Sequence, residues 1–178
     1  MPGCGKSTVG RHLARQLALR FADSDAEIEK RIGMPIRDFF AERGEAAFRD
    51  VEQDVIEDLS QQTGQVLATG GGAVLRPSNR DALHSRTHVF YLRSTPEELS
   101  RRLRHDSHRP LLQVADPNAR LRELYRERDP LYRRTAHFVV EAARPSVQAL
   151  TGMVLMQLEL AGLVDPGQVP STIDQRPA

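Results

Sequence analysis

The sequence has one cysteine, Cys4, no tryptophan and few aromatic residues. A single cysteine excludes an intramolecular disulfide, and few aromatics leave little for base stacking. Lysines and arginines number 25 against 24 acidic residues, so no charge excess indicates a nucleic-acid or membrane surface. No apolar run reaches the ~20 residues of a membrane span, and the first residues lack a secretory signal core. We therefore expect a cytoplasmic protein that binds neither nucleic acid nor membrane.

Lysine is also scarce, since only Lys6 and Lys30 are lysines and the other basic residues are arginines. In so arginine-rich a chain, the number of arginines alone is weak support for RNA binding, and the acidic residues nearly balance them. A functional role for Lys6 carries more weight here, because the chain rarely uses lysine. The length of 178 residues and the 39% hydrophobic content predict one globular domain.

Predicted helices and short strands alternate along the chain. Helices are expected over about residues 6–18, 26–32, 36–43, 45–61, 78–84, from 95 onward, 118–128 and 146–160, and strands over 20–23, 65–69, 88–92 and 137–140. This alternation predicts βαβ units and a parallel sheet, hence an α/β fold. Three prolines and no apolar periodicity mark the end of the chain. We expect one domain over residues 1–163 and a flexible tail over 164–178.

The first residues contain most of a phosphate-binding loop. The pattern G-x-x-x-x-G-K-[ST] ends here in Gly5, Lys6 and Ser7, while its first glycine would fall one residue before Met1. Gly3 and Gly5 allow backbone N–H groups to face phosphate oxygens at the start of a helix. Lys6 would reach the β- and γ-phosphates, and Ser7 would bind Mg²⁺. The alternative is a helix start without a ligand, which the use of a rare lysine disfavours.

Two charged pairs follow. Asp23 and Asp25 come at the end of a predicted strand, where ligands bind in open α/β sheets. One carboxylate could face metal-bound water and the other a substrate hydroxyl, but an acidic turn that caps the next helix is an equally open interpretation. Arg49 and Glu52 share a helix face. They are either a surface ion pair or an arginine held ready to receive a carboxylate.

A glycine triplet and a polar connection complete the candidate site. Residues 70–72 are glycines at the end of a predicted strand, and they either expose backbone N–H groups to a ligand or form a permissive loop. Residues 105–117 join two helices and could close over a nucleotide as a lid. His105 and His108 lie in this segment without nearby cysteines or a second histidine pair, so we expect no metal site there.

Together, these segments resemble shikimate kinase. The matching stretches, in family order over about residues 1–141, are PGCGKSTVGRHLA, FADSDAEIEKRIG, FRDVEQDV, LATGGGAV, RPLL and ERDPLY. The resemblance implies a three-layer P-loop kinase fold, with a parallel sheet flanked by helices on both faces. It also implies Mg²⁺-dependent transfer of the ATP γ-phosphoryl group to the 3-hydroxyl of shikimate, in aromatic amino-acid biosynthesis, by a monomer.

The resemblance implies a role for each matching residue. Nucleotide binding is implied for Gly3, Cys4, Gly5, Lys6, Ser7, Thr8, Arg102, Arg109 and Arg144, and metal binding for Ser7 and Asp23. Shikimate binding is implied for Asp25, Arg49, Glu52, Gly70, Gly71, Gly72 and Arg128. Catalysis would rest on Lys6, Asp25 and Arg109. The alternatives are another small-molecule kinase of the gluconate type and a truncated, non-catalytic nucleotide-binding protein.

One departure from the family concerns the sheet. The family's first strand, which runs through the middle, has no counterpart here, so the strands before Gly70 and before Leu92 should face each other across a gap. Buried backbone groups left unpaired there would cost ~1–3 kcal/mol each. Either Met1 is an internal methionine preceded by about 8–15 further residues, or the chain is a truncated, inactive product. The complete set of downstream site residues favours the first explanation.

Overall fold

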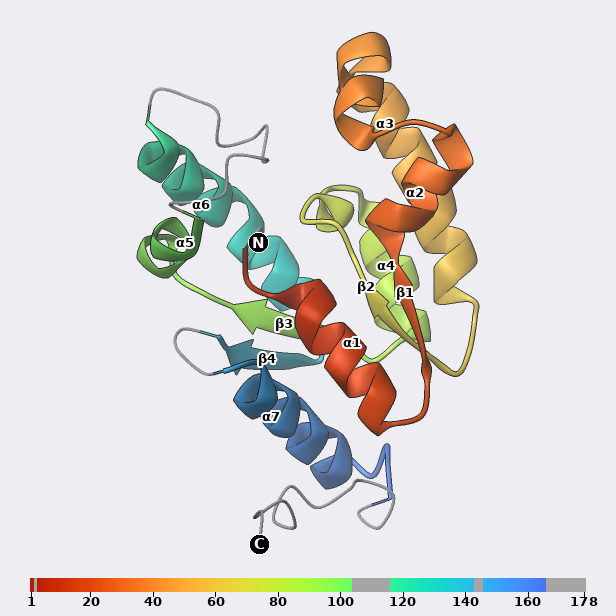
Figure 1. Ribbon diagram of the computed structural model, residues 1–178, viewed down its shortest axis with the longest axis vertical. Coiled ribbons are helices and arrows are strands. Elements are labelled where there is room, and N and C mark those ends of the chain that lie inside the picture. Colours follow the sequence, from red (N-terminus) through yellow and green to blue (C-terminus); the bar gives the residue numbers. More distant parts are fainter. Residues whose placement is uncertain (2, 104–115, 143–145, 166–178) are drawn as a thin grey trace, which may run out of the picture.

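The computed structural model describes residues 1, 3–103, 116–142 and 146–165, and helices alternate with short strands along it (Figure 1). The helices are α1 (Lys6–Gln16), α2 (Ser24–Ile32), α3 (Ile36–Ser60), α4 (Pro77–Arg86), α5 (Pro96–Leu103), α6 (Pro117–Thr135) and α7 (Val147–Leu160). The strands are β1 (Arg20–Asp23), β2 (Gln65–Ala68), β3 (Phe90–Arg93) and β4 (Phe138–Glu141), and a 3-10 turn, η1 (Ala73–Leu75), follows β2. The expected histidine pair His105 and His108, most of the lid, Arg109, Arg144 and the tail from residue 166 lie outside the described residues.

Local capping explains where helices begin. The N–H of Thr95 donates to Glu98 Oε2 at 2.9 Å, and the N–H of Glu98 donates back to Thr95 Oγ1 at 3.4 Å. This reciprocal capping box confirms the predicted start of α5. Asp116 Oδ1 accepts from the N–H groups of Asn118 and Ala119 at 3.0 and 2.9 Å, and Pro117 occupies the first position of α6.

One predicted helix break is present and one helix is longer than expected. The two helices predicted on either side of Gly44 are the two arms of α3, which meet at Gly44 with the non-helical φ 79° and ψ 175°. The prediction that a helix ends near Arg128 was wrong, because α6 continues through Pro130 to Thr135. Proline removes one helical N–H. The next turn still forms, because Thr135 is buried and its Oγ1 donates to Leu131 O at 2.8 Å.

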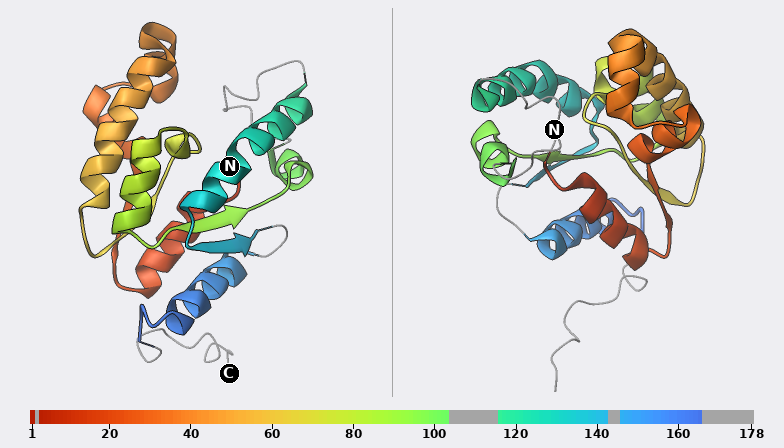
Figure 2. Two further views of the ribbon diagram at one scale, coloured as in Figure 1. Left: turned by 180° about the vertical axis from the view of Figure 1, so that it is seen from behind. Right: turned by 45° about the horizontal axis from the view of Figure 1, so that its top comes forward.

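The strands form two parallel pairs with helices on both faces. Strand β1 pairs with β2, with Arg20 opposite Gln65, and β3 pairs with β4, with Phe90 opposite Phe138. Helices α1 and α7 pack together on one face, while α3, α4 and α6 lie on the other (Figure 2). This arrangement confirms the expected three-layer α/β fold. In the part of the chain that the structure describes, no backbone ladder joins the two pairs.

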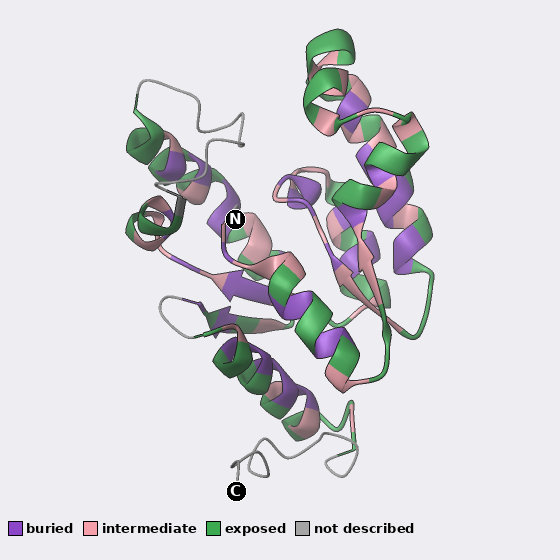
Figure 3. Ribbon diagram, viewed as in Figure 1, coloured by how far each residue is buried: buried purple, intermediate pink, exposed green. Residues whose placement is uncertain are grey.

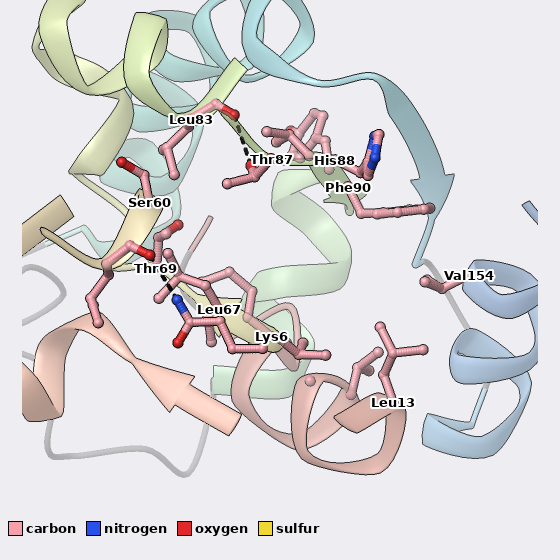
Figure 4. A pocket seen from close by; sticks show the side chains of 18 of the residues that line it. Lys6, Leu13, Ser60, Leu67, Thr69, Leu83, Thr87, His88, Phe90 and Val154 are labelled. Atoms are coloured by element: carbon pink, nitrogen blue, oxygen red, sulfur yellow. Dashed lines mark hydrogen bonds between the residues drawn. The ribbon is translucent and has the colours of Figure 1, made fainter. Parts of the chain in front are cut away.

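A cavity of about 680 Å³ lies between β2 and β3 (Figure 4). Its lining is mainly apolar and includes Leu13 of α1, Leu67 of β2, Phe90 of β3 and Val154 of α7. The expected gap between the strands is therefore present, and helices rather than a ladder hold the two pairs together.

The buried apolar residues form a large cluster, a smaller one, and a third around Ile56, Ala73 and Leu83 (Figure 3). The large one joins α1, α5, α6 and α7 to β3 and β4, and it includes Met1, which is 1% exposed. Burial lowers the pKa of the Met1 amine to about 5. The smaller one joins α2 to α3 around Ile28, Phe48 and Val55. Among the described residues, no helix combines the length and apolarity needed to cross a bilayer.

Candidate active site

The phosphate loop turns tightly into the start of α1. Gly3 and Gly5 have φ of 76° and 84°, in the left-handed region that favours glycine, and α1 begins at Lys6. The Lys6 ammonium donates from Nζ to Met1 O at 2.9 Å, and Cys4 Sγ donates to the same carbonyl at 3.0 Å. Lys6 therefore folds back over its own loop, so its charge lies beside the N–H groups at the helix start. Such a helix start attracts an anion.

The expected metal ligands Ser7 and Asp23 lie together. Ser7 Oγ donates to Asp23 Oδ2 at 2.7 Å, while Asp23 Oδ1 accepts from the N–H of Asp25 at 3.1 Å and caps α2. The helix cap is therefore confirmed: one oxygen of Asp23 caps α2, and the other accepts from Ser7 in the phosphate loop. The role of Asp23 toward a metal stays a prediction. A hydroxyl and a carboxylate are oxygen ligands of the kind that Mg²⁺ prefers, and Mg²⁺ usually completes its shell with phosphates and water. No group of three or more His, Cys, Asp or Glu among the described residues could hold a metal by itself.

Asp25 lies beside the first glycine of the triplet. A Cβ at Gly70 would stand 2.5 Å from Asp25 Oδ1 and 3.3 Å from Glu52 Oε1, so both carboxylates approach this backbone. The N–H of Gly70 donates to Ser24 Oγ at 3.0 Å, which ties the end of β2 to the start of α2. Burial raises the pKa of the Asp25 carboxyl above its ordinary value, and the nearby charge of Asp23 raises it further. A carboxylate with a raised pKa is a better proton acceptor.

Arg49 and Glu52 form a pair that is buried rather than on the surface. Arg49 Nη1 donates to Glu52 Oε2 at 2.7 Å, and the two side chains are 13% and 1% exposed. Burial raises the pKa of Glu52 more than the charge of Arg49 lowers it. Arg49 also donates from Nε and Nη2 to Glu45 Oε1, at 3.2 and 2.9 Å. Burial alone would lower the pKa of the Arg49 guanidinium, but the two glutamates raise it, so the cation is held in one orientation.

Arg128, from the distant helix α6, reaches the same glycines. It is 5% exposed, and its Nη1 donates to Gly71 O at 3.0 Å. Its Nε is buried and has no hydrogen-bond partner. A buried guanidinium with an unpaired donor is costly, and a bound anion would remove that cost. At the neighbouring Gly72, an added Cβ would overlap the guanidinium of Arg49. The two arginines therefore approach adjacent glycines from different helices.

Two contacts at this site were missed by the sequence analysis. Tyr132 donates from Oη to Gly71 O at 2.6 Å, and Glu45 holds Arg49 from one helical turn away. The spacing of four residues between Glu45 and Arg49 was a readable signal. No local pattern indicated the contact between Tyr132 and Gly71, which are 61 residues apart. Arg102 donates from Nη2 to Ala142 O at 2.5 Å, and its expected place near adenine stays a prediction.

Comparisons with known proteins agree with this arrangement. A family model described as shikimate kinase matches residues 2–159. The chain is 59% identical over 169 residues to a shikimate kinase of Paracidovorax citrulli, covering 93% of this chain and 92% of the relative. It is 54% identical over 173 residues to a shikimate kinase of Ralstonia nicotianae, covering 97% and 91%.

A solved structure has the same fold. The shikimate kinase from Acinetobacter baumannii in complex with shikimate has a TM-score of 0.85 and 44% identity, with 90% of this chain and 89% of that chain covered. A shikimate kinase structure from Aquifex aeolicus has a TM-score of 0.76 and 32% identity, with 92% and 95% covered. On the family match, the identities and the shared fold, this chain belongs to the shikimate kinase family.

Proposed function

We propose that this chain transfers the γ-phosphoryl group of ATP to the 3-hydroxyl of shikimate and so forms shikimate 3-phosphate for aromatic amino-acid biosynthesis. The observation that carries the proposal is the approach of Asp25, Arg49 and Arg128 to one glycine loop. Shikimate is a small molecule with one carboxylate and several hydroxyls. Two arginines, a carboxylate and exposed backbone groups are the complement that such a molecule needs. The Acinetobacter baumannii relative, solved with shikimate, supports this choice of substrate.

The substrate carboxylate would bind between the arginines. Arg128 has a buried Nε without a partner, and Arg49 is oriented by Glu52 and Glu45. Guanidinium groups bind carboxylates through paired N–H donors. With both arginines held by protein contacts before substrate arrives, little side-chain entropy remains to be lost on binding. Glu52 acts here by holding Arg49.

The phosphoryl transfer would use the opposite side of the same space. Asp25, whose pKa is raised, would orient the attacking hydroxyl and accept its proton. Lys6 would contact the β- and γ-phosphates, and Ser7 and Asp23 would hold Mg²⁺. Mg²⁺, when bound, neutralises charge on the phosphate oxygens during transfer. Arg109, in the connection over residues 105–117, would approach the transferred group when that lid closes and excludes water. We further propose one domain over residues 1–163, working as a monomer.

The test is ATP- and Mg²⁺-dependent phosphorylation of shikimate, with gluconate as a competing acceptor. Asp25→Asn should lower kcat by about 10²–10⁴-fold, and Arg49→Ala should abolish measurable transfer, while both variants keep their affinity for ATP. Arg31→Ala is the matched control, because Arg31 forms an exposed ion pair with Asp58 at 2.7 Å, away from the glycine loop. Equal loss of ATP affinity in the Asp25 and Arg49 variants would contradict the acceptor site. Preference for gluconate would overturn the substrate.

The two lysines provide a second matched pair. Lys6→Ala should lower kcat by about 10²–10³-fold, the usual effect of removing one group that stabilises transition-state charge. Lys30→Ala should change little, because Lys30 is exposed and forms an ion pair with Glu27 at 3.6 Å. A Lys6→Ala variant that keeps most of its activity would refute the role of the phosphate loop.

A further inference from the structure

Helix α6 sends two side chains to one carbonyl oxygen. Arg128 Nη1 and Tyr132 Oη both donate to Gly71 O, at 3.0 and 2.6 Å. The two residues are four positions apart, so they lie on the same face of α6, one turn from each other. The resemblance to the family implies a role for Arg128, and none was inferred for Tyr132. We propose that Tyr132 is a positioning residue that fixes the Gly71–Gly72 peptide for shikimate binding; this inference rests on the proposed function.

The glycine loop needs an external restraint. Three consecutive glycines have no side chains to restrict their backbone. The peptide between Gly71 and Gly72 is planar, so holding its carbonyl oxygen on α6 turns the N–H of Gly72 to the opposite side. That orientation presents the N–H away from α6, as a donor for a substrate hydroxyl. The same restraint keeps Gly72 close against the guanidinium of Arg49, where no Cβ would fit.

The phenol is suited to this role because it stays neutral. Burial raises the pKa of Tyr132 far above the physiological range, so the hydroxyl keeps its proton and donates. Its ring stacks on Tyr91, with centroids 4.8 Å apart. Tyr132 therefore has little freedom to leave Gly71, and the hydrogen bond at 2.6 Å is short for a neutral pair.

A separate set of contacts fastens α6 to β3. Asp129 Oδ1 accepts from Tyr91 Oη at 2.9 Å and from Arg93 Nε at 3.2 Å, both from β3. Within α6, Asp129 Oδ2 also accepts from Arg133 Nε at 2.8 Å. These bonds hold the helix without touching the glycine loop. Tyr91 and Tyr132 are thus two stacked tyrosines, of which Tyr132 donates to Gly71 O and Tyr91 donates to Asp129. They form a matched pair for separating stability from positioning.

The experiment compares Tyr132→Phe with Tyr91→Phe. Tyr132→Phe should raise the KM for shikimate and the Kd for shikimate about 3- to 10-fold, as the loss of one neutral hydrogen bond predicts. Its KM for ATP should stay within 2-fold of the parent value. Tyr91→Phe should lower the thermal unfolding temperature at least as much as Tyr132→Phe does. It should leave the KM for shikimate within 2-fold of the parent value. A merely structural role of Tyr132 would instead lower the active fraction, and hence kcat, without changing KM.

Three results would overturn the proposal. The first is a KM for shikimate within 2-fold of the parent in Tyr132→Phe, and the second is an equal rise in Tyr91→Phe. The third is a parent chain that neither binds nor phosphorylates shikimate; this would remove the proposed function itself, and with it the inference. Failure of Tyr132 alone, with the parent active, leaves the proposed function intact, so the two failures are distinguishable.

Discussion

The proposed shikimate-binding residues, here called the acceptor side, and the proposed ATP-binding residues, here called the nucleotide side, are held in place differently. On the acceptor side, Glu52 and Arg128 are buried and Arg49 is partly buried, and they are held by side chains and backbone from α3, α6 and the glycine loop. On the nucleotide side, Lys6 and Cys4 both donate to the carbonyl of Met1, at the edge of the cavity between β2 and β3. The acceptor side is therefore pre-organised by the protein, whereas the nucleotide side contacts a region where the sheet is open.

The largest effect should come from filling the cavity. An extended apolar segment of about six residues, added ahead of Met1, would enter beside β2 and β3, each of which pairs on one edge only within the described residues. Burial of its side chains and pairing with both strands should raise the free energy of unfolding by at least about 3 kcal/mol, or ~6–12 °C in Tm. Thermal unfolding measures this.

The control is a segment of equal length made of glycine and serine, which cannot fill an apolar space. ATP affinity should increase with the apolar segment, because Lys6 and Cys4 line the cavity. Shikimate affinity should change less than 2-fold, because the cavity lining does not include Asp25, Arg49 or Arg128. Equal Tm for the two extended chains would show that the open sheet does not limit stability. A larger increase in affinity for shikimate than for ATP would mean that the acceptor side, and not the nucleotide side, depends on the open part of the sheet.

The next effect concerns the acceptor side alone. Gly72→Ala places a methyl group where the guanidinium of Arg49 lies. In the proposed binding mode, displacing Arg49 removes a charge-assisted contact to the substrate carboxylate worth about 1.5–3 kcal/mol, so the KM for shikimate should rise roughly 10- to 100-fold. Gly152→Ala is the control: Gly152 lies in α7, with nothing within 4 Å of an added Cβ. That variant should gain about 0.5–1 kcal/mol of stability from helix propensity and keep its KM. An unchanged KM in Gly72→Ala would mean that Arg49 has room to bind elsewhere.

Local chemistry made much of this fold predictable. Strand β1 occupies the predicted residues 20–23, and the capping box of Thr95 and Glu98 forms as its spacing indicated. The spacing of Arg49 and Glu52 predicted their pairing but not its burial, because burial depends on elements from elsewhere in the chain. Tyr132 was missed for the same reason, since its partner is 61 residues away. Local patterns also predicted that a helix ends near Arg128, just before Pro130. The helix continues to Thr135, because packing of the next turn outweighs the effect of the proline. The functional roles of the site residues stay predictions.

The smallest expected effect concerns pH. As the pH falls, the contributions of the nucleotide side and of the acceptor side to the free energy of unfolding should change in opposite directions. On the nucleotide side, burial lowers the pKa of the Met1 amine from 8.0 to about 5. Between these values the unfolded chain binds a proton that the folded chain does not, so stability falls as pH falls from 8 to 5. On the acceptor side, burial raises the pKa of Asp25 and Glu52. These carboxyls take up protons more readily when folded, so they favour folding as the pH falls through their raised pKa values.

Nα-acetylation of Met1 isolates the first contribution. The free-amine chain should lose about 2 kcal/mol of unfolding free energy between pH 8 and pH 6, relative to the acetylated chain. Urea unfolding at both pH values measures the difference. Both chains keep the contribution of His137, whose pKa is lowered by burial and by the charges of His84 and His88. This contribution also lowers the stability of the folded chain as the pH falls below ~6.5. Because both chains share His137, Asp25 and Glu52, their difference reports the terminus alone. An equal pH dependence in the two chains would mean that the amine reaches solvent, and the nucleotide side would then be open at Met1 as well as at the cavity.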